Sequence, residues 1–461
     1  MGAMHVGESA EPLALAEARA RARAVLWVRN GAVLGALTAA GLLLYGASRT
    51  LGESVPGTLL AGLAATIVVV LAWVALDLAL VRRPGIPAIT LSPADARELH
   101  EMVRGLAEEL DVPVPDGIRL CPECDSWLEP GARRARSTVL VIGAPFLWWL
   151  RVGELRALLA PVVAGTEASA EPAVAGARRW VRRLDAVADV RRSLGPVPLR
   201  PARRVSRAFA RQLLGLCQGH AELMEREIAV GAAALAIPLE PELRAIAHEQ
   251  VGLAYAGWDR LLTRLAAPAW TIGRRPDALM TGVVSALTEL SRRDKLADAF
   301  GARLAERAAS DLLADAVAMD GEISRLAAGI FADGPTPDPV AWTDYPEAVI
   351  EPVWRARAAA FAAPVDDALA VLRRDPDDDH REAADHLFAV VACAALDTGR
   401  MHPAVDWLDG PVLVDGRGHA VDLATLITRA VDEGNDTPLR TWLAHIGIPT
   451  REPVHPGGSA A

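Results

Sequence analysis

Cysteine and lysine are scarce in this sequence. Four cysteines among 461 residues cannot build a disulfide scaffold and are typical of a reducing compartment. Lys295 is the single lysine among 48 basic residues, which together with the excess of alanine indicates a GC-rich genome rather than a function. The net charge of −10 argues against a general nucleic-acid binder, because phosphate contacts need a basic surface.

The motifs of several common chemistries are missing as well. The sequence has no P-loop, no G-x-S-x-G nucleophile elbow and no dinucleotide-binding fingerprint. What it does contain is a high share of apolar residues, 52%, which excludes intrinsic disorder for most of the chain. At roughly 150 residues per domain, its length allows about three structural units.

Two long uncharged segments lie near the N-terminus, at residues 30–48 and 54–76. About 20 apolar residues are enough to cross the ~30 Å hydrocarbon layer of a bilayer as a helix. A signal peptide followed by a buried helix is the alternative, but the first segment is long for a signal peptide, and the second follows after five residues. We therefore expect a two-helix transmembrane hairpin over residues 25–83, after a cytosolic segment at 1–24.

The charges around this predicted hairpin indicate its orientation. The connecting loop has little net charge, because Arg49 is offset by Glu53. By the positive-inside rule, basic outer flanks place both termini and the soluble part in the cytoplasm of a bacterial cell, with the chain integral to the plasma membrane. The flanking arginines are Arg19, Arg21, Arg23 and Arg29 before the hairpin, and Arg82 and Arg83 after it.

The soluble part mixes helical patterns with a few short strands. Ser92 is a candidate cap for a helix with apolar residues at spacings of three and four. Strand-like runs follow at 117–120 and 137–142, and a second helix is expected from Arg151. A Pro-rich linker is predicted at 331–346, then a C-terminal helical region at 347–450 with a β-hairpin near Asp415, and a disordered tail at 451–461.

Arginine is concentrated in one stretch, Arg178–Arg211. Residues 177–211 hold eleven arginines against two aspartates, a local charge of +9. This pattern fits a solvated helical face between buried helices. It fits equally well a surface that contacts the anionic lipids of the inner leaflet, where each nearby cation contributes ~1 kcal/mol.

The order of these segments resembles a known family of membrane enzymes. A hairpin, a helix leading into VPVP, the segment STVLVIGAPFLWWL and then RVGELRALLAPVVAG are similar to the membrane-anchored zinc metallopeptidases typified by HtpX and the CAAX prenyl protease. The resemblance implies a zincin-like metallopeptidase domain at residues 84–330. In that family the corresponding helix carries H-E-x-x-H, whose histidines bind zinc and whose Glu activates the bound water.

The residues of that motif are lost in this chain. Pro161 and Gly165 stand at the two histidine positions, and Val162 stands at the position of the catalytic Glu. No two of the ten histidines are four residues apart, so the motif does not occur elsewhere. Pro161 is also expected to kink or restart its helix, because proline lacks a backbone N–H. The family's third zinc ligand falls on Glu222, which cannot hold a metal ion alone.

A relocated structural zinc site is a further hypothesis. Cys121 and Cys124 form a C-x-x-C pair, and Cys217 and His220 form a C-x-x-H pair, together a Cys3His set. Nothing in the sequence shows that the two pairs meet. Cys217 is equally well explained as a small buried apolar residue. We therefore expect no cofactor, with a structural zinc as the alternative.

These observations predict a mainly α-helical fold with a small β element behind the membrane hairpin. Three functions remain as hypotheses. The preferred one is a membrane-anchored pseudopeptidase that binds or regulates membrane-protein or peptide clients without catalysis, for example in protein quality control. The second is an active zinc metalloendopeptidase with displaced ligands, and the third is a structural membrane adaptor.

Overall fold

The computed structural model is mainly helical, with three small sheets in the part of the chain that it describes. The chain divides into two compact units. The first comprises residues 1–120, 125–142 and 153–248, and the second comprises 121–124, 143–152 and 249–461. The division thus falls near residue 248, earlier than the domain boundary expected at 330. The described residues are 4–50, 55–81, 87–131, 137–189, 200–239, 241–293, 303, 305–332, 334–360 and 380–448.

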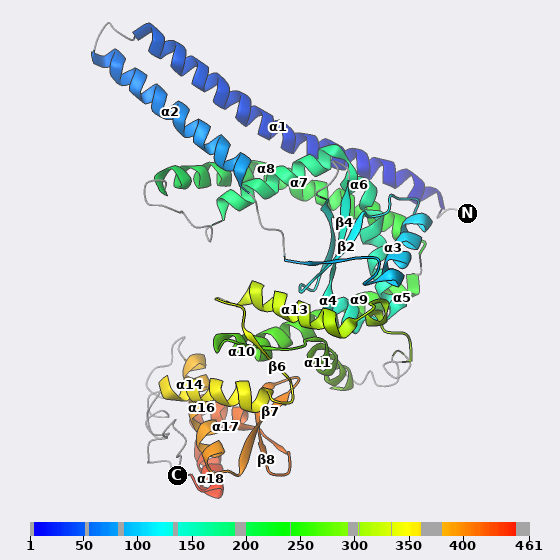
Figure 1. Cartoon of the computed structure of the whole chain (residues 1–461), viewed down its shortest axis with the longest axis vertical. Coiled ribbons are helices and arrows are strands. Elements are labelled where there is room, and N and C mark those ends of the chain that lie inside the picture. Colours follow the sequence, from blue (N-terminus) through cyan, green and yellow to red (C-terminus); the bar gives the residue numbers. More distant parts are fainter. Residues whose placement is uncertain are drawn as a thin grey trace. The chain divides into compact units, whose positions relative to one another are not determined.

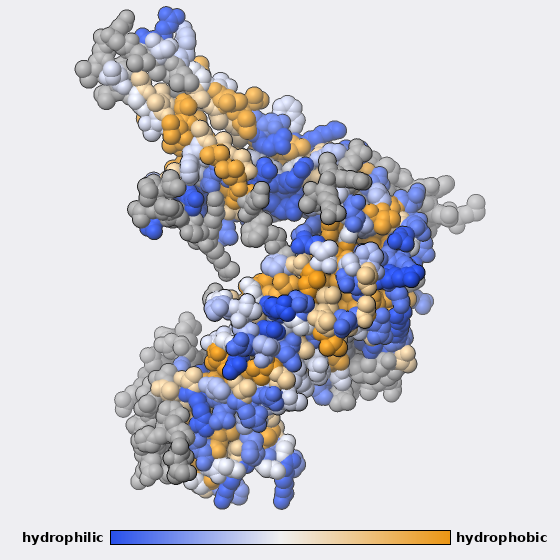
Figure 2. Space-filling view, in the orientation of Figure 1, coloured by the Kyte–Doolittle hydropathy of each residue, from blue (hydrophilic) through white to orange (hydrophobic). Residues whose placement is uncertain are grey.

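Two helices, α1 (Met4–Thr50) and α2 (Val55–Leu80), run side by side in the first unit (Figure 1). Each contains a stretch long and apolar enough to cross a membrane, at Ala14–Leu42 and Ala61–Leu80. Leu37 in α1 and Val69 in α2 are 65% and 67% exposed. Apolar side chains cover much of the visible surface of both helices (Figure 2). Such exposure suits a lipid-facing surface, because the packing within the protein leaves these side chains uncovered.

The N-terminal part of α1 packs against the soluble part of the same unit. Ala18, Ala22 and Val25 are fully buried in a core that they share with α7 (Pro172–Ala188) and α8 (Arg200–Ala236). The end of α2 joins the same core. The second half of the segment 1–24, expected to precede the hairpin as a cytosolic region, therefore belongs to the packed helix α1.

A four-stranded sheet in the first unit has the order β1-β2-β4-β3, so that β1 and β3 are its edges. The runs expected at 117–120 and 137–142 are confirmed as strands β2 and β4. The pairs β1–β2 and β3–β4 are antiparallel. The strands are β1 (Ile89–Leu91), β2 (Gly117–Cys121), β3 (Ser126–Pro130) and β4 (Thr138–Gly143).

Of two local predictions about helices in this unit, the cap at Ser92 is wrong, and the restart expected at Pro161 does not occur. Helix α3 (Arg97–Glu109) begins after Ala96, and Ser92 instead makes a turn with Asp95, whose backbone N–H bonds the serine hydroxyl. Helix α5 (Val152–Ala164) continues through Pro161 without a restart. It is followed by the short helix α6 (Thr166–Ala170).

The second unit is a helical assembly with two small sheets. Strand β5 (Arg274–Pro276) pairs in parallel with β6 (Asp338–Val340). Because β6 and the buried Tyr345 fall within 331–346, the expected linker is wrong: this segment is part of the packed unit. The helical segments are α4 (Ala144–Trp149), α9 (Pro241–Arg260), η2 (Leu261–Ala266), α10 (Ala267–Thr271), α11 (Met280–Arg293), η3 (Ala309–Leu312), α13 (Ala316–Phe331), η4 (Pro346–Ile350), α14 (Glu351–Ala360), α16 (His380–Asp397), α17 (Leu423–Val431) and α18 (Thr437–Ile446).

The hairpin expected near Asp415 is confirmed. Strand β8 (Gly410–Asp415) pairs antiparallel with β9 (Ala420–Val421) and with β7 (Met401–Asp406). The Asp415 carboxylate accepts backbone N–H bonds from Arg417 and His419, which closes the turn. The tail expected at 451–461 lies outside the described residues.

Candidate functional site

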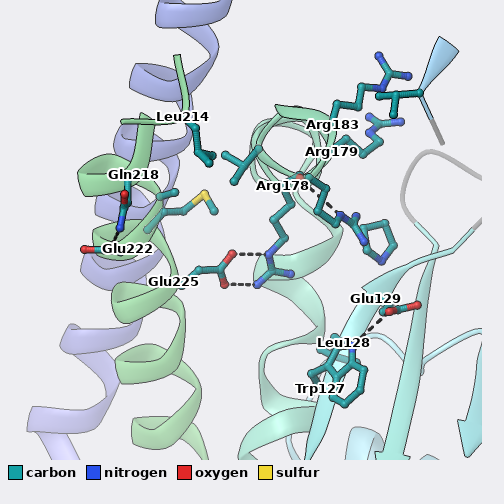
Figure 3. A pocket seen from close by; sticks show the side chains of 16 residues that line it. Trp127, Leu128, Glu129, Arg178, Arg179, Arg183, Leu214, Gln218, Glu222 and Glu225 are labelled. Carbon is teal, nitrogen blue, oxygen red and sulfur yellow. Dashed lines mark hydrogen bonds and ion pairs between the residues drawn. The ribbon is translucent and has the colours of Figure 1, made fainter. Parts of the chain in front are cut away.

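A cavity with a volume of about 1260 Å³ lies in the first unit. It lies between α7 and α8, with the edge strand β3 on another side (Figure 3). Val81, the residue that directly follows α2, also lines it. We call this cavity the α7–α8 groove. Its charged and polar lining consists of Glu129, Arg178, Arg179, Arg182, Arg183, Gln218, Glu222 and Glu225.

One ion pair crosses the groove from α7 to α8. Nε and Nη2 of Arg178 donate to the two carboxylate oxygens of Glu225 at 2.7 and 2.6 Å (Figure 3). Nη1 of Arg178 also donates to the Ser169 hydroxyl at 2.9 Å. The Arg178 side chain is only 17% exposed, whereas Glu225 is 47% exposed. The bidentate geometry fixes the spacing of the two helices at this point.

For two other arginines of α7, Arg179 and Arg183, no ion pair with a carboxylate is seen among the described residues. Nε of Arg179 donates only to the carbonyl of Ala175, one turn earlier in the same helix. Arg183 is exposed, and its guanidinium makes no hydrogen bond or ion pair with the described residues. Both side chains extend from α7 on the side away from Glu222 and Glu225 (Figure 3). Cations one turn apart on a helix repel each other, so this cluster favours an anionic ligand.

The acidic residues of the groove are held by neighbours. Glu222 is exposed and accepts a hydrogen bond from the Gln218 amide at 2.9 Å on the same helix. Glu129 on β3 accepts from Arg119 at 3.0 Å. The unengaged charge in the groove is therefore mainly positive, on the α7 side.

Strand β3 brings a free backbone edge to the groove. Its neighbour β4 pairs with it, and Gly131 just beyond the strand donates its N–H to the carbonyl of Ser137. Bonded and non-bonded pairs alternate in an antiparallel ladder, so Glu129 and Trp127 exchange bonds with β4. The N–H and C=O of Leu128 consequently point away from β4. Such an edge can accept a further strand.

The positions at which the sequence resemblance expects a metallopeptidase motif lie elsewhere. Gly165 is buried, and a Cβ at this position would lie 3.8 Å from Cβ of Ala232 on α8. Glu222 precedes Ala232 by ten residues, which corresponds to about 15 Å along α8. Beside Gly165 the structure leaves a cavity of only about 30 Å³, lined by α6, α8 and Leu15 of α1. The three-position site expected from Pro161, Gly165 and Glu222 is therefore not assembled.

The proposed Cys3His set gains no support from the geometry. Cys121 and Cys124 belong to the second unit, whereas Cys217 and His220 belong to the first. Within the described ranges, no group of three or more His, Cys, Asp or Glu side chains is placed to hold a metal ion. Cys217 lies in the core of the first unit, and burial raises the pKa of its thiol, which disfavours the thiolate that zinc requires.

Sequence reasoning found the arginines and Glu222 but missed the β3 side of the groove. The strand Ser126–Pro130 follows the C-x-x-C turn and contains a proline, and neither feature favours a strand. Gln218 and Glu225 were missed as well. Gln218 lies four residues before Glu222, and Glu225 lies three residues after it, so all three share one helix face. This spacing was the available signal.

Comparison with known proteins gives no identification. No protein-family model, no curated protein and no solved structure matches this chain. The function must therefore be argued from the site.

Proposed function

We propose that the chain is a membrane-anchored, non-catalytic binding protein, a pseudopeptidase by its sequence resemblance, which holds an extended acidic segment of a membrane-protein client in the α7–α8 groove. The observation that carries this proposal is the free edge of β3 opposite the arginines of α7 in the α7–α8 groove. An extended peptide could form backbone hydrogen bonds with β3 while its carboxylates meet the arginines.

The absence of catalysis is supported by the residues at the motif positions. Pro161, Val162 and Gly165 offer neither a zinc ligand nor a general base. The space beside Gly165 has room for about one water molecule and none for a peptide. Peptide binding and water activation would therefore have to occur in separate places, whereas a hydrolase needs both at one site.

The position of the groove favours a client that is itself a membrane protein. Val81 follows α2, one of the two helices suited to span a membrane, and lines the groove. With α2 in the bilayer, the groove opens close to the membrane surface. The juxtamembrane segment of a neighbouring membrane protein would reach it without unfolding of its soluble domains.

Fluorescence anisotropy with the full chain in a nonionic detergent tests this proposal. The ligand is a labelled ten-residue peptide of alternating Glu and Val. We expect binding that weakens when Lys replaces Glu, and also when alternate backbone amides are N-methylated. Leu128→Pro removes the outward N–H of β3 and should lower the affinity about tenfold, the loss expected for a backbone hydrogen bond. Val114→Pro, in an exposed proline-rich turn, is the matched control.

Two outcomes would contradict the proposal. Equal affinity for the N-methylated and unmodified peptides would exclude strand addition at β3. Zinc-dependent hydrolysis of an unfolded protein by the purified chain would instead favour the metalloendopeptidase hypothesis. If no peptide binds and nothing is cleaved, the structural adaptor becomes the better hypothesis.

A further inference from the structure

The cations at the α2 side of the groove are not accounted for by an acidic client alone. Arg179 and Arg183 extend away from Glu222 and Glu225, and neither forms an ion pair with a carboxylate among the described residues (Figure 3). Arg178, in contrast, is held by Glu225. Arg178 is thus held inside the groove, whereas Arg179 and Arg183 carry charges that no carboxylate among the described residues balances.

The margin lies where a membrane-suited helix ends. Helix α2 ends at Leu80, and Val81 lines the same cavity as Arg179 and Arg183. Leu76 and Leu80 are 49% and 68% exposed. An apolar surface that lies next to arginines fits the boundary of a bilayer, where the acyl chains are next to the headgroups.

We propose that Arg179 and Arg183 form a binding site for the phosphate of an anionic phospholipid in the leaflet at the C-terminal end of α2. Two guanidinium groups one turn apart on α7 can donate to the phosphate oxygens together. The acyl chains would lie along the exposed end of α2. The inference rests on the proposed membrane anchoring, but it does not depend on the peptide client.

A thermal unfolding titration of the full chain in nonionic detergent tests the site. A lipid that binds the native but not the unfolded protein raises its melting temperature, and the rise increases with lipid concentration and affinity. We expect phosphatidylglycerol to raise the melting temperature of the unmodified chain, and phosphatidylcholine to have little effect. In the variant R179Q/R183Q the apparent affinity for phosphatidylglycerol should fall about 25-fold, the product of about fivefold for each cation near the surface.

Two control variants make the result specific. R104Q/R417Q removes two exposed arginines elsewhere and should respond to phosphatidylglycerol like the unmodified chain. R179K/R183K keeps both charges and should retain most of the affinity. If R179K/R183K binds phosphatidylglycerol, substitution at these two positions does not itself misfold the chain. The loss in R179Q/R183Q then comes from the missing charges.

Several results would overturn the proposal. One is an unchanged affinity for phosphatidylglycerol in R179Q/R183Q. Another is equal stabilisation by glycerol 3-phosphate or inorganic phosphate at the same concentration, which would indicate a site for a soluble phosphate. Peptide binding to the unmodified chain separates the two proposals: peptide binding without a response to phosphatidylglycerol overturns only the lipid site, and the reverse overturns only the client groove.

Discussion

Helix α8 borders two hollows that differ about fortyfold in volume. Toward Arg178 it carries long polar side chains and faces a groove of about 1260 Å³. Toward Gly165 it carries Gly231 and Ala232 and leaves only about 30 Å³. A Cβ at Gly231 would come within 3.3 Å of Cβ of Ala14 on α1, so the helices already touch there.

The contrast shows that side-chain size along one helix determines which face of the molecule can hold a ligand. Small residues let α1 and α5 approach α8 and close the place where the metallopeptidase resemblance would put catalysis. The bidentate pair between Arg178 and Glu225 spans α7 and α8 where they enclose open space. Four predictions test this contrast, in order of decreasing effect.

Gly231→Leu should produce the largest change, because the new side chain must push α1 away from α8. We expect a loss of about 3 kcal/mol in the free energy of unfolding, the upper range for overpacked sites. Unfolding in mixed detergent micelles measures it. The matched control is Gly219→Leu on the same helix, where a Cβ meets nothing within 4 Å. That variant should gain about 0.5 kcal/mol from helix propensity. Similar losses for both would contradict tight packing at Gly231.

Arg178→Gln removes the ion pair across the groove and the bond to Ser169. We expect a loss of about 1–2 kcal/mol in the free energy of unfolding. Glu225→Gln should lose about 0.5 kcal/mol, because that side chain is half exposed and solvent screens its charge. A double-mutant cycle measures the coupling, which should decrease in 1 M salt. A coupling of zero at low salt would mean that the pair does not link the helices.

Cys217 should react slowly with a thiol reagent in the native chain. Burial raises its pKa and limits access, whereas Cys124 is only half-buried. We expect Cys124 to be labelled about tenfold faster or more, as is typical of accessible thiols. Mass spectrometry of the labelled peptides gives both rates, and denatured protein supplies the reference in which the rates converge. Protection of both cysteines by added zinc would revive the Cys3His hypothesis.

Glu222→Gln should have the smallest effect. The side chain is exposed and bonds only Gln218, so the free energy of unfolding should change by less than about 0.5 kcal/mol. Elemental analysis should find the same zinc content in the variant and the unmodified chain. A loss of bound zinc would place Glu222 in a metal site after all.

The parts of the fold that follow a strong local pattern were predictable. The two membrane-suited helices, the strands at 117–120 and 137–142 and the hairpin near Asp415 all carry clear hydrophobic or turn signals. The start of α3 at Arg97 was not, since Ser92 has the chemistry of a cap but uses it in a turn. The supposed linker at 331–346 was misjudged because its prolines hid a strand that forms only by pairing with β5.

The candidate site likewise has features that the sequence predicts and features that it does not. The identities of residues 161, 162 and 165 and the concentration of arginine are properties of the chain order alone, since they require no knowledge of the fold. Which carboxylate meets Arg178, which cysteines share a unit, and whether Glu222 stands beside Gly165 depend on how helices pack. Local periodicity predicts the direction of a side chain around its own helix but not the distance from that helix to a second one. That distance determines why the α7–α8 groove is open and why the space beside Gly165 is closed.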